Sequence, residues 1–167
     1  MQPQAHTSSR LSHALLALRV CGAILILFVG ADHYYTYSVD DYSVLPTIGV
    51  LFLLNFISAT AVGLALLAPL ERIFHRFGKL VLQFTALSGA GIAGTSLIAL
   101  LVSEQTKLFG FMETNYRTAI IVAIVSEAAA TVTLGLLLVL TLRGRRSVGE
   151  RSRPSVAERH RASAGTT

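Results

Sequence analysis

Charged residues and cysteine are both scarce in this 167-residue sequence, and each shortage excludes a class of protein. Asp, Glu, Lys and Arg make up 14% of the residues, too few to cover a soluble domain. The single cysteine, Cys21, excludes an intramolecular disulfide and a cysteine metal cluster. Glycine-rich phosphate loops are missing, and Ser126 has no neighbouring His or Lys to activate it as a nucleophile. We therefore expect no enzymatic activity and no cofactor.

Long apolar runs dominate what remains. Hydrophobic residues make up 53% of the chain, and the mean hydropathy is +0.62. A helix crosses a bilayer with roughly 20 mainly apolar residues, and four segments meet that length: residues 14–35, 45–68, 78–102 and 118–142. The sequence therefore predicts an all-α fold, a four-transmembrane-helix bundle over residues 14–142.

Lys and Arg are distributed unevenly between the connections, which predicts the orientation of the bundle in the membrane. The first connection has Asp32, Asp40 and Asp41 and no basic residue. Basic residues gather before the first helix, in the second connection and after the last helix: Arg10, Arg19, Arg72, Arg76, Lys79, Arg143, Arg145, Arg146, Arg151, Arg153, Arg159 and Arg161. Because basic flanks stay inside, we expect both termini to be cytoplasmic in a bacterial plasma membrane.

Both ends of the chain are poor in apolar residues. Residues 1–13 and 143–167 are rich in Ser, Arg, Ala and Gly, and we expect both to be disordered. The basic tail is typical of a flank that sets topology. The alternative is contact with anionic lipid headgroups at the inner leaflet or with an acidic partner. No folded basic domain is present, so we expect no nucleic acid.

The first helix is the weakest of the four predictions, because Arg19 interrupts its apolar run. Val29-Gly30-Ala31 also fits a signal-peptide cleavage site, which leaves a cleaved signal followed by three helices as the alternative. We favour a retained helix, because Arg19 can reach the inner interface and three tyrosines mark the outer one: Tyr34, Tyr35 and Tyr37.

The second connection is amphipathic. In residues 71–79, Ile73, Phe74 and Phe77 fall on one side of a helix and Arg72 and Arg76 on another. This pattern predicts a short interfacial helix on an anionic leaflet.

One carboxylate, Glu127, lies too deep in an apolar run to reach an end. It is about 13 Å from the start of its helix at 1.5 Å per residue, and Asn55 and Thr95 lie at similar depths in theirs. We therefore predict an intramembrane polar layer of Glu127, Asn55 and Thr95. Small residues that favour close helix packing accompany this layer: Ala86, Ala90, Gly94, Ala123 and Ala130.

Two interpretations of Glu127 remain open. An acid near the bilayer centre costs about 2.5 to 3.5 kcal/mol on insertion scales, and such residues mark proton or cation pathways. Alternatively, a protonated Glu127 hydrogen-bonds Asn55 or a backbone carbonyl and only holds helices together. We favour packing, because no Lys or Arg lies at that depth and relays usually need a second titratable group.

Histidine and the remaining acids give weaker signals. A haem needs two facing imidazoles at one depth. Only His13 and His75 could pair in this way, and both lie at polar edges rather than in an apolar pocket, so we expect no haem. We place His33 at the outer interface as an anchor. Six residues could gather around a divalent cation on the outer side, namely Asp32, His33, Asp40, Asp41, Glu104 and Glu113, yet their spacing specifies no site. We interpret them as a solvated surface and expect no metal.

Two stretches carry a resemblance. Gly30 to Tyr35 together with Leu45 to Asn55, and Phe109 to Glu113 followed by Ser126 to Ala129, resemble a group of small, uncharacterised four-helix integral membrane proteins of actinobacteria. The resemblance implies four helices with the first retained, and it implies no activity. We expect a non-enzymatic structural or accessory membrane subunit with a membrane-protein partner or as a homo-oligomer. The alternative is a small oligomeric proton- or cation-coupled transporter or channel that uses Glu127.

Overall fold

The computed structural model describes residues 4–39, 42–106 and 118–151, and the regular structure in these segments is helical throughout. Long helices are α1 (Gln4–Val39), α2 (Pro46–Leu67), α4 (Gly78–Gln105) and α5 (Thr118–Arg151). Short helical turns lie in the connections: η1 (Tyr42–Val44), α3 (Leu70–Ile73) and η2 (His75–Phe77). Each long helix contains a stretch long and apolar enough to cross a membrane. The predicted four-helix membrane bundle is therefore confirmed.

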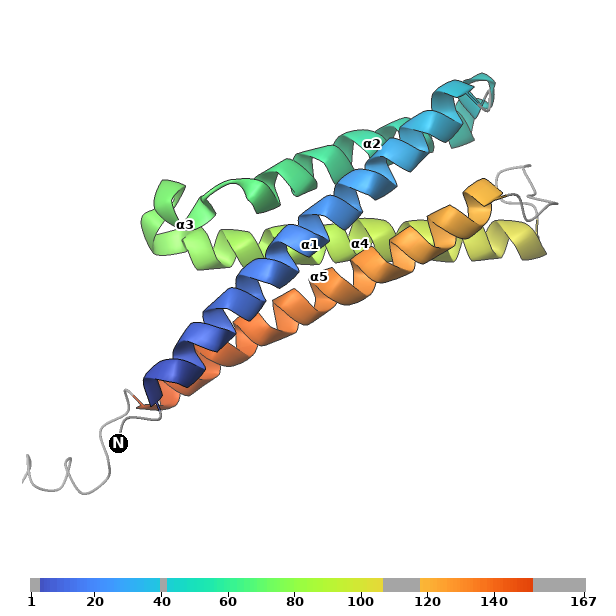
Figure 1. Ribbon diagram of the computed structural model, residues 1–167. Helices are drawn as coiled ribbons and strands as arrows, with labels where there is room; N and C mark the ends of the chain where they lie inside the picture. Colours follow the sequence, from blue (N-terminus) through green and yellow to red (C-terminus); the bar gives the residue numbers. More distant parts are fainter. Residues whose placement is uncertain (1–3, 40–41, 107–117, 152–167) are drawn as a thin grey trace, which may run out of the picture.

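The long helices pack in the ring order α1, α2, α4, α5, so that each contacts two neighbours along its length. Figure 1 shows the start of α1, the end of α5 and α3 at one end of the bundle. The α1–α2 turn and the start of α5 lie at the other end. We call these the terminal end and the loop end. The helices α1 and α4 stand diagonally opposite, so side chains that join them cross the centre of the bundle.

Two helices run further than the sequence predicts. Helix α1 begins at Gln4 and ends at Val39, and α5 continues to Arg151, so both extend into segments expected to be disordered. The rest of those segments, residues 1–3 and 152–167, lies outside the described residues. The second connection forms two short turns rather than one helix, because His75 takes a positive φ of 35° that no helix continues through. Its residues 71–77 are exposed, as expected for an interfacial segment.

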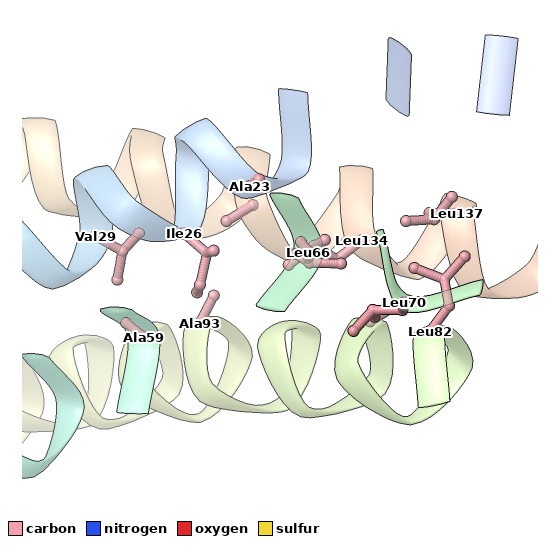
Figure 2. Close-up of a cluster of buried hydrophobic side chains, with 12 residues drawn as sticks. Ala23, Ile26, Val29, Ala59, Leu66, Leu70, Leu82, Ala93, Leu134 and Leu137 are labelled. Carbon is pink, nitrogen blue, oxygen red and sulfur yellow. The ribbon is translucent and has the colours of Figure 1, made fainter. Parts of the chain in front are cut away.

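An apolar core fills the half of the bundle nearer the terminal end (Figure 2). Its largest fully buried side chains include Ile26, Leu66, Leu134 and Leu137, which come from α1, α2 and α5. Leu134 lies between Gly22 and Gly89: a Cβ on Gly22 would be 2.5 Å from Leu134 Cδ2, and a Cβ on Gly89 would be 2.7 Å from Leu134 Cδ1. Glycine at both positions lets α1 and α4 close on this side chain.

The predicted packing residues are placed unequally. Ala86 and Ala130 are buried in the core and Ala90 packs against it. Gly94 and Ala123 are half-buried, and a Cβ on Gly94 would make only ordinary contact, 3.5 Å, with Thr131. The buried stripe of α4 runs instead through Leu82, Ala86, Gly89 and Ala93. An α-helix has 3.6 residues per turn, so residues spaced by four drift around the helix. The predicted stripe therefore starts on the buried face at Ala86 and has rotated away from it at Gly94.

Arg19 is held at the terminal end by a defined set of acceptors. Its Nε donates to the carbonyl of Leu66 at 2.6 Å, and its Nη2 donates to the carbonyl of Ala68. Its Nη1 lies 2.9 Å from Oε1 and 3.0 Å from Oε2 of Glu71. The guanidinium thus caps two carbonyls at the end of α2, where a helix dipole favours a cation. This explains how an arginine is tolerated inside an apolar run.

Candidate functional site: a buried histidine, serine and glutamate

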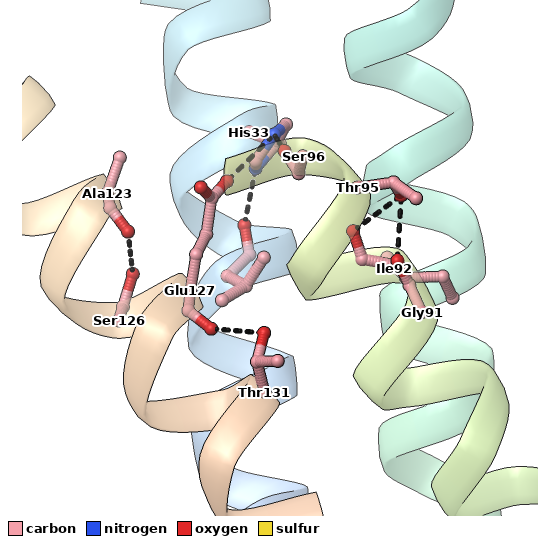
Figure 3. Close-up of polar contacts among 10 residues, drawn as sticks. His33, Gly91, Ile92, Thr95, Ser96, Ala123, Ser126, Glu127 and Thr131 are labelled. Carbon is pink, nitrogen blue, oxygen red and sulfur yellow. Dashed lines mark hydrogen bonds and ion pairs between the residues drawn. The ribbon is translucent and has the colours of Figure 1, made fainter. Parts of the chain in front are cut away.

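Three polar side chains from three helices meet inside the bundle (Figure 3). His33 of α1 and Glu127 of α5 are buried, with 7% and 1% of their surfaces exposed, and Ser96 of α4 is half-buried. His33 Nε2 lies 2.9 Å from Ser96 Oγ and 3.6 Å from Glu127 Oε1. The Ser96 side chain also hydrogen-bonds the carboxyl group of Glu127. The hydroxyl of Ser96 therefore links the imidazole to the carboxyl group.

The position of one proton in this site follows from the backbone. His33 Nδ1 lies 2.9 Å from the carbonyl oxygen of Val29, which can only accept a hydrogen bond. Nδ1 must therefore carry a proton, and Nε2 is the nitrogen that gains or loses one. This arrangement points the titrating nitrogen at Ser96 and Glu127.

Two protonation patterns satisfy the same hydrogen bonds. In the first, Glu127 is protonated and donates to Ser96 Oγ, and the Ser96 hydroxyl donates to a neutral Nε2. In the second, a protonated Nε2 donates to Ser96 Oγ, and the hydroxyl donates to an ionised Glu127. A hydroxyl both donates and accepts, so a shift along the chain converts one pattern into the other. Either pattern leaves the site without net charge.

The other oxygen of the carboxyl group has no such support. Glu127 Oε2 is buried and has no hydrogen-bond partner. If the site loses its mobile proton, a negative charge remains in the bundle with one oxygen unpaired, and such a charge is costly in a low-dielectric interior. The arrangement therefore ties the charge of the bundle centre to the presence of one proton.

Aromatic rings cover the site on the side of the loop end. The ring of Phe52 in α2 lies 4.9 Å from the imidazole of His33, and the ring of Tyr42 in η1 lies 5.1 Å from that of Phe52. Toward the terminal end, Val29, Ala93 and Ala130 are fully buried next to the three polar side chains. The imidazole is thus held between the Val29 carbonyl of its own helix and side chains of α2, α4 and α5.

The prediction that Thr95 belongs to the polar layer is wrong. Thr95 is exposed, and its hydroxyl donates to the carbonyls of Gly91 and Ile92 in its own helix. Figure 3 shows it on the side of α4 away from Glu127. Successive residues of a helix are rotated by about 100°, so an equal depth does not give an equal direction. The inward residue of this turn is Ser96.

Asn55, the other predicted partner, is half-buried in α2. Its side-chain oxygen is buried and accepts no hydrogen bond. The expected hydrogen bond from a protonated Glu127 to this oxygen is therefore not formed. Asn55 and Glu127 share the property of a buried acceptor oxygen without a donor.

Besides Ser96, sequence reasoning missed His33 as a residue of this site. The apolar run ends at Tyr35, which predicts an outer interfacial anchor at His33. The helix instead continues to Val39, which places His33 about 9 Å below its end. The spacing of the sequence carried a signal. Ile26, Val29 and Gly30 precede His33 by seven, four and three residues, so His33 shares their helix face. The structure shows that this face is buried.

Three of the six residues predicted for a solvated outer surface are described by the structure. His33 is buried, and Asp32 and Glu104 are half-buried, so none of the three is fully exposed. In the part of the chain that the structure describes, no three His, Cys, Asp or Glu side chains are grouped as a metal site requires. Asp40, Asp41 and Glu113 lie outside the described residues.

Comparison with protein-family models, with curated proteins and with solved structures finds no match.

Proposed function

We propose that this multi-pass membrane protein binds and releases a proton at the His33–Ser96–Glu127 site and couples that exchange to transport. The observation that carries the proposal is the 3.6 Å approach of His33 Nε2 to Glu127 Oε1 inside the bundle. The site has the second titratable group that a relay needs, and intramembrane ionisable residues usually mark such pathways. Charge neutrality with one proton bound supplies the physical basis for coupling.

Orientation in the membrane belongs to the same proposal. We assign the terminal end to the cytoplasm, because it carries Arg19, Arg72, Arg76 and Arg143. Ile73, Phe74 and Phe77 are exposed beside Arg72 and Arg76, a combination that suits anionic lipid headgroups of the inner leaflet of a bacterial plasma membrane. The loop end with Tyr34 and Tyr35 then faces outward.

Infrared difference spectroscopy tests proton binding without knowledge of a transported species. The purified protein in lipid is exposed to a pH step, and the carbonyl stretch of a protonated carboxyl group is recorded. We expect a pH-dependent carboxyl band that disappears in Glu127→Gln and persists in the control Glu104→Gln. A wild-type band that does not change across the stability range of the protein would exclude proton exchange at Glu127.

The accessory role makes a different prediction. If the pair only packs helices, Glu127→Gln retains a hydrogen-bonding side chain of the same shape and leaves assembly intact. The protein then co-purifies with a stoichiometric partner whether or not Glu127 can titrate. A pH-independent site together with such a partner would favour the accessory subunit over the proton-coupled carrier.

A further inference from the structure

We infer that the His33–Ser96–Glu127 site, in the conformation that the structure shows, exchanges its proton only with the loop end of the bundle, which is the one-sided access of a carrier rather than the open path of a channel. This inference rests on the proposed function and adds the direction of access. It follows from the depth of the site and from the residues on either side of it.

The site lies nearer the loop end. Glu127 is about 13 Å along α5 from Thr118 and about 24 Å from Arg143. Ser96 is about 13 Å along α4 from Gln105 and about 27 Å from Gly78. Two helices thus give the same result, with the site in the outer part of a core that is about 30 Å thick.

The path toward the terminal end is closed by apolar side chains that we call the apolar plug: Ala23, Ile26, Leu66, Ala86, Leu134 and Leu137. Each is at most 1% exposed, and together they come from all four long helices. From Glu127 to Leu137 the plug extends for about 15 Å. Close-packed apolar side chains leave no room for water, and a proton needs water or a titratable group at each step.

Among the residues whose burial the structure describes, two buried polar residues lie on the terminal side, and neither bridges the plug. Thr85 donates its hydroxyl to the carbonyl of Val81 in its own helix. Gln83 is buried, and it lies about 20 Å along α4 from Ser96. Arg19 is bound to the end of α2 and to Glu71. These groups belong to the terminal end.

The path toward the loop end is shorter and, beside the rings of Phe52 and Tyr42, more polar. Asp32 adjoins His33 on α1 and acts electrostatically on Glu127. On α4, Ser103 is buried and Glu104 is half-buried. Helix α2 contacts His33 through Phe52, and α5 has no other charged residue between Thr118 and Glu127. Among the residues that the structure describes, the charged groups near the site, Asp32 and Glu104, are therefore acidic and lie on its outer side.

The test uses the wild-type chain with a protease-cleavable C-terminal tag, reconstituted in vesicles under conditions that give unequal orientations. The fraction of chains with a protected tag is measured first. The external pH is then stepped and the carboxyl band is recorded before and after an ionophore equalises the two sides. An entrapped pH dye reports the internal pH throughout.

We expect the band amplitude before ionophore, relative to that after it, to equal the fraction of chains with protected tags. An amplitude equal to the fraction with cleavable tags would place access at the terminal end and overturn the inference. A full amplitude before ionophore, or a dye signal that equilibrates faster than in Glu127→Gln vesicles, would indicate a two-sided path and also overturn it. A band that stays silent after ionophore would instead refute the proposed function.

Discussion

His33 and Glu127 lie 94 positions apart in the chain, yet Nε2 of one is 3.6 Å from Oε1 of the other in the interior of the bundle. Ser96, from a third helix, lies 2.9 Å from the same nitrogen. An imidazole and a carboxyl group buried together hold one proton without net charge, whichever of the two carries it. This relationship gives the protein a chemical property that its apolar surface does not suggest.

The first prediction concerns the energetic coupling of this pair. His33→Gln and Glu127→Gln should each lower the free energy of unfolding by about 1 to 3 kcal/mol, because each leaves a buried polar partner unsatisfied. The double variant should lose at least about 0.5 kcal/mol less than the sum, as expected for residues in one hydrogen-bonded network. Reversible denaturation in mixed micelles measures all four free energies. The pair His33→Gln and Glu104→Gln is the control and should be additive.

The second prediction separates Ser96 from its neighbour. Ser96→Ala should cost about 0.5 to 1.5 kcal/mol and slow proton exchange at Glu127, because it removes the hydroxyl that links the imidazole to the carboxyl group. Thr95→Ala should leave the exchange rate unchanged, since that exposed hydroxyl bonds only to its own helix. Infrared spectra after a rapid pH jump give both rates. Equal rates in the two variants would remove Ser96 from the site.

The third prediction uses the absence of tryptophan from the sequence. Phe52→Trp places a single fluorophore against the ring of His33, which Phe52 contacts at a centroid distance of 4.9 Å. A protonated imidazole quenches indole emission through contact, so the emission should change with pH in this variant. The change should be absent from Phe52→Trp combined with His33→Gln. Emission that responds to pH equally in both would assign the signal elsewhere.

The fourth prediction concerns the capping of α2. Arg19→Ala should lower the free energy of unfolding by about 2 to 3 kcal/mol, because charge-assisted bonds to two helix-end carbonyls are lost together. Glu71→Gln should cost less than about 1 kcal/mol, since the Glu71 side chain is 44% exposed and its ion pair is screened by solvent. Thermal unfolding in micelles compares the two. A larger loss for Glu71→Gln than for Arg19→Ala would show that the ion pair with Glu71, rather than the carbonyls of α2, is the main contribution of Arg19 to stability.

The fifth prediction concerns the retention of α1. Its side chains Ala23, Ile26 and Val29 are fully buried in the core, and cleavage after Ala31 would remove them all. We therefore expect the membrane-extracted protein to keep α1, as the mass of its N-terminal peptide will show. Ile26→Ala should cost about 2 to 5 kcal/mol through the cavity it creates, whereas the exposed Ile24→Ala should cost far less. A mature N-terminus after Ala31 would contradict a four-helix bundle.

Some elements of this protein could be read from local sequence. Each spanning helix is defined by the length and composition of one continuous apolar run, so the segments over Pro46–Leu67 and Gly78–Gln105 were predicted within three residues of their ends. The depth of Glu127 followed from counting residues along α5. The predicted boundaries in polar flanks were less accurate, because no apolar run marks where α1 begins and ends or where α5 ends.

Composition and the fixed rise of a helix are enough to predict that this chain forms four membrane-length helices and that one carboxyl group lies deep among them. Which side chains face that carboxyl group depends on how the helices pack. The rotation of each helix about its axis is set by packing against its neighbours, around Leu134 and the glycines beside it. That rotation turns Ser96 inward and Thr95 outward, and it brings His33, a residue predicted for the surface, to Glu127.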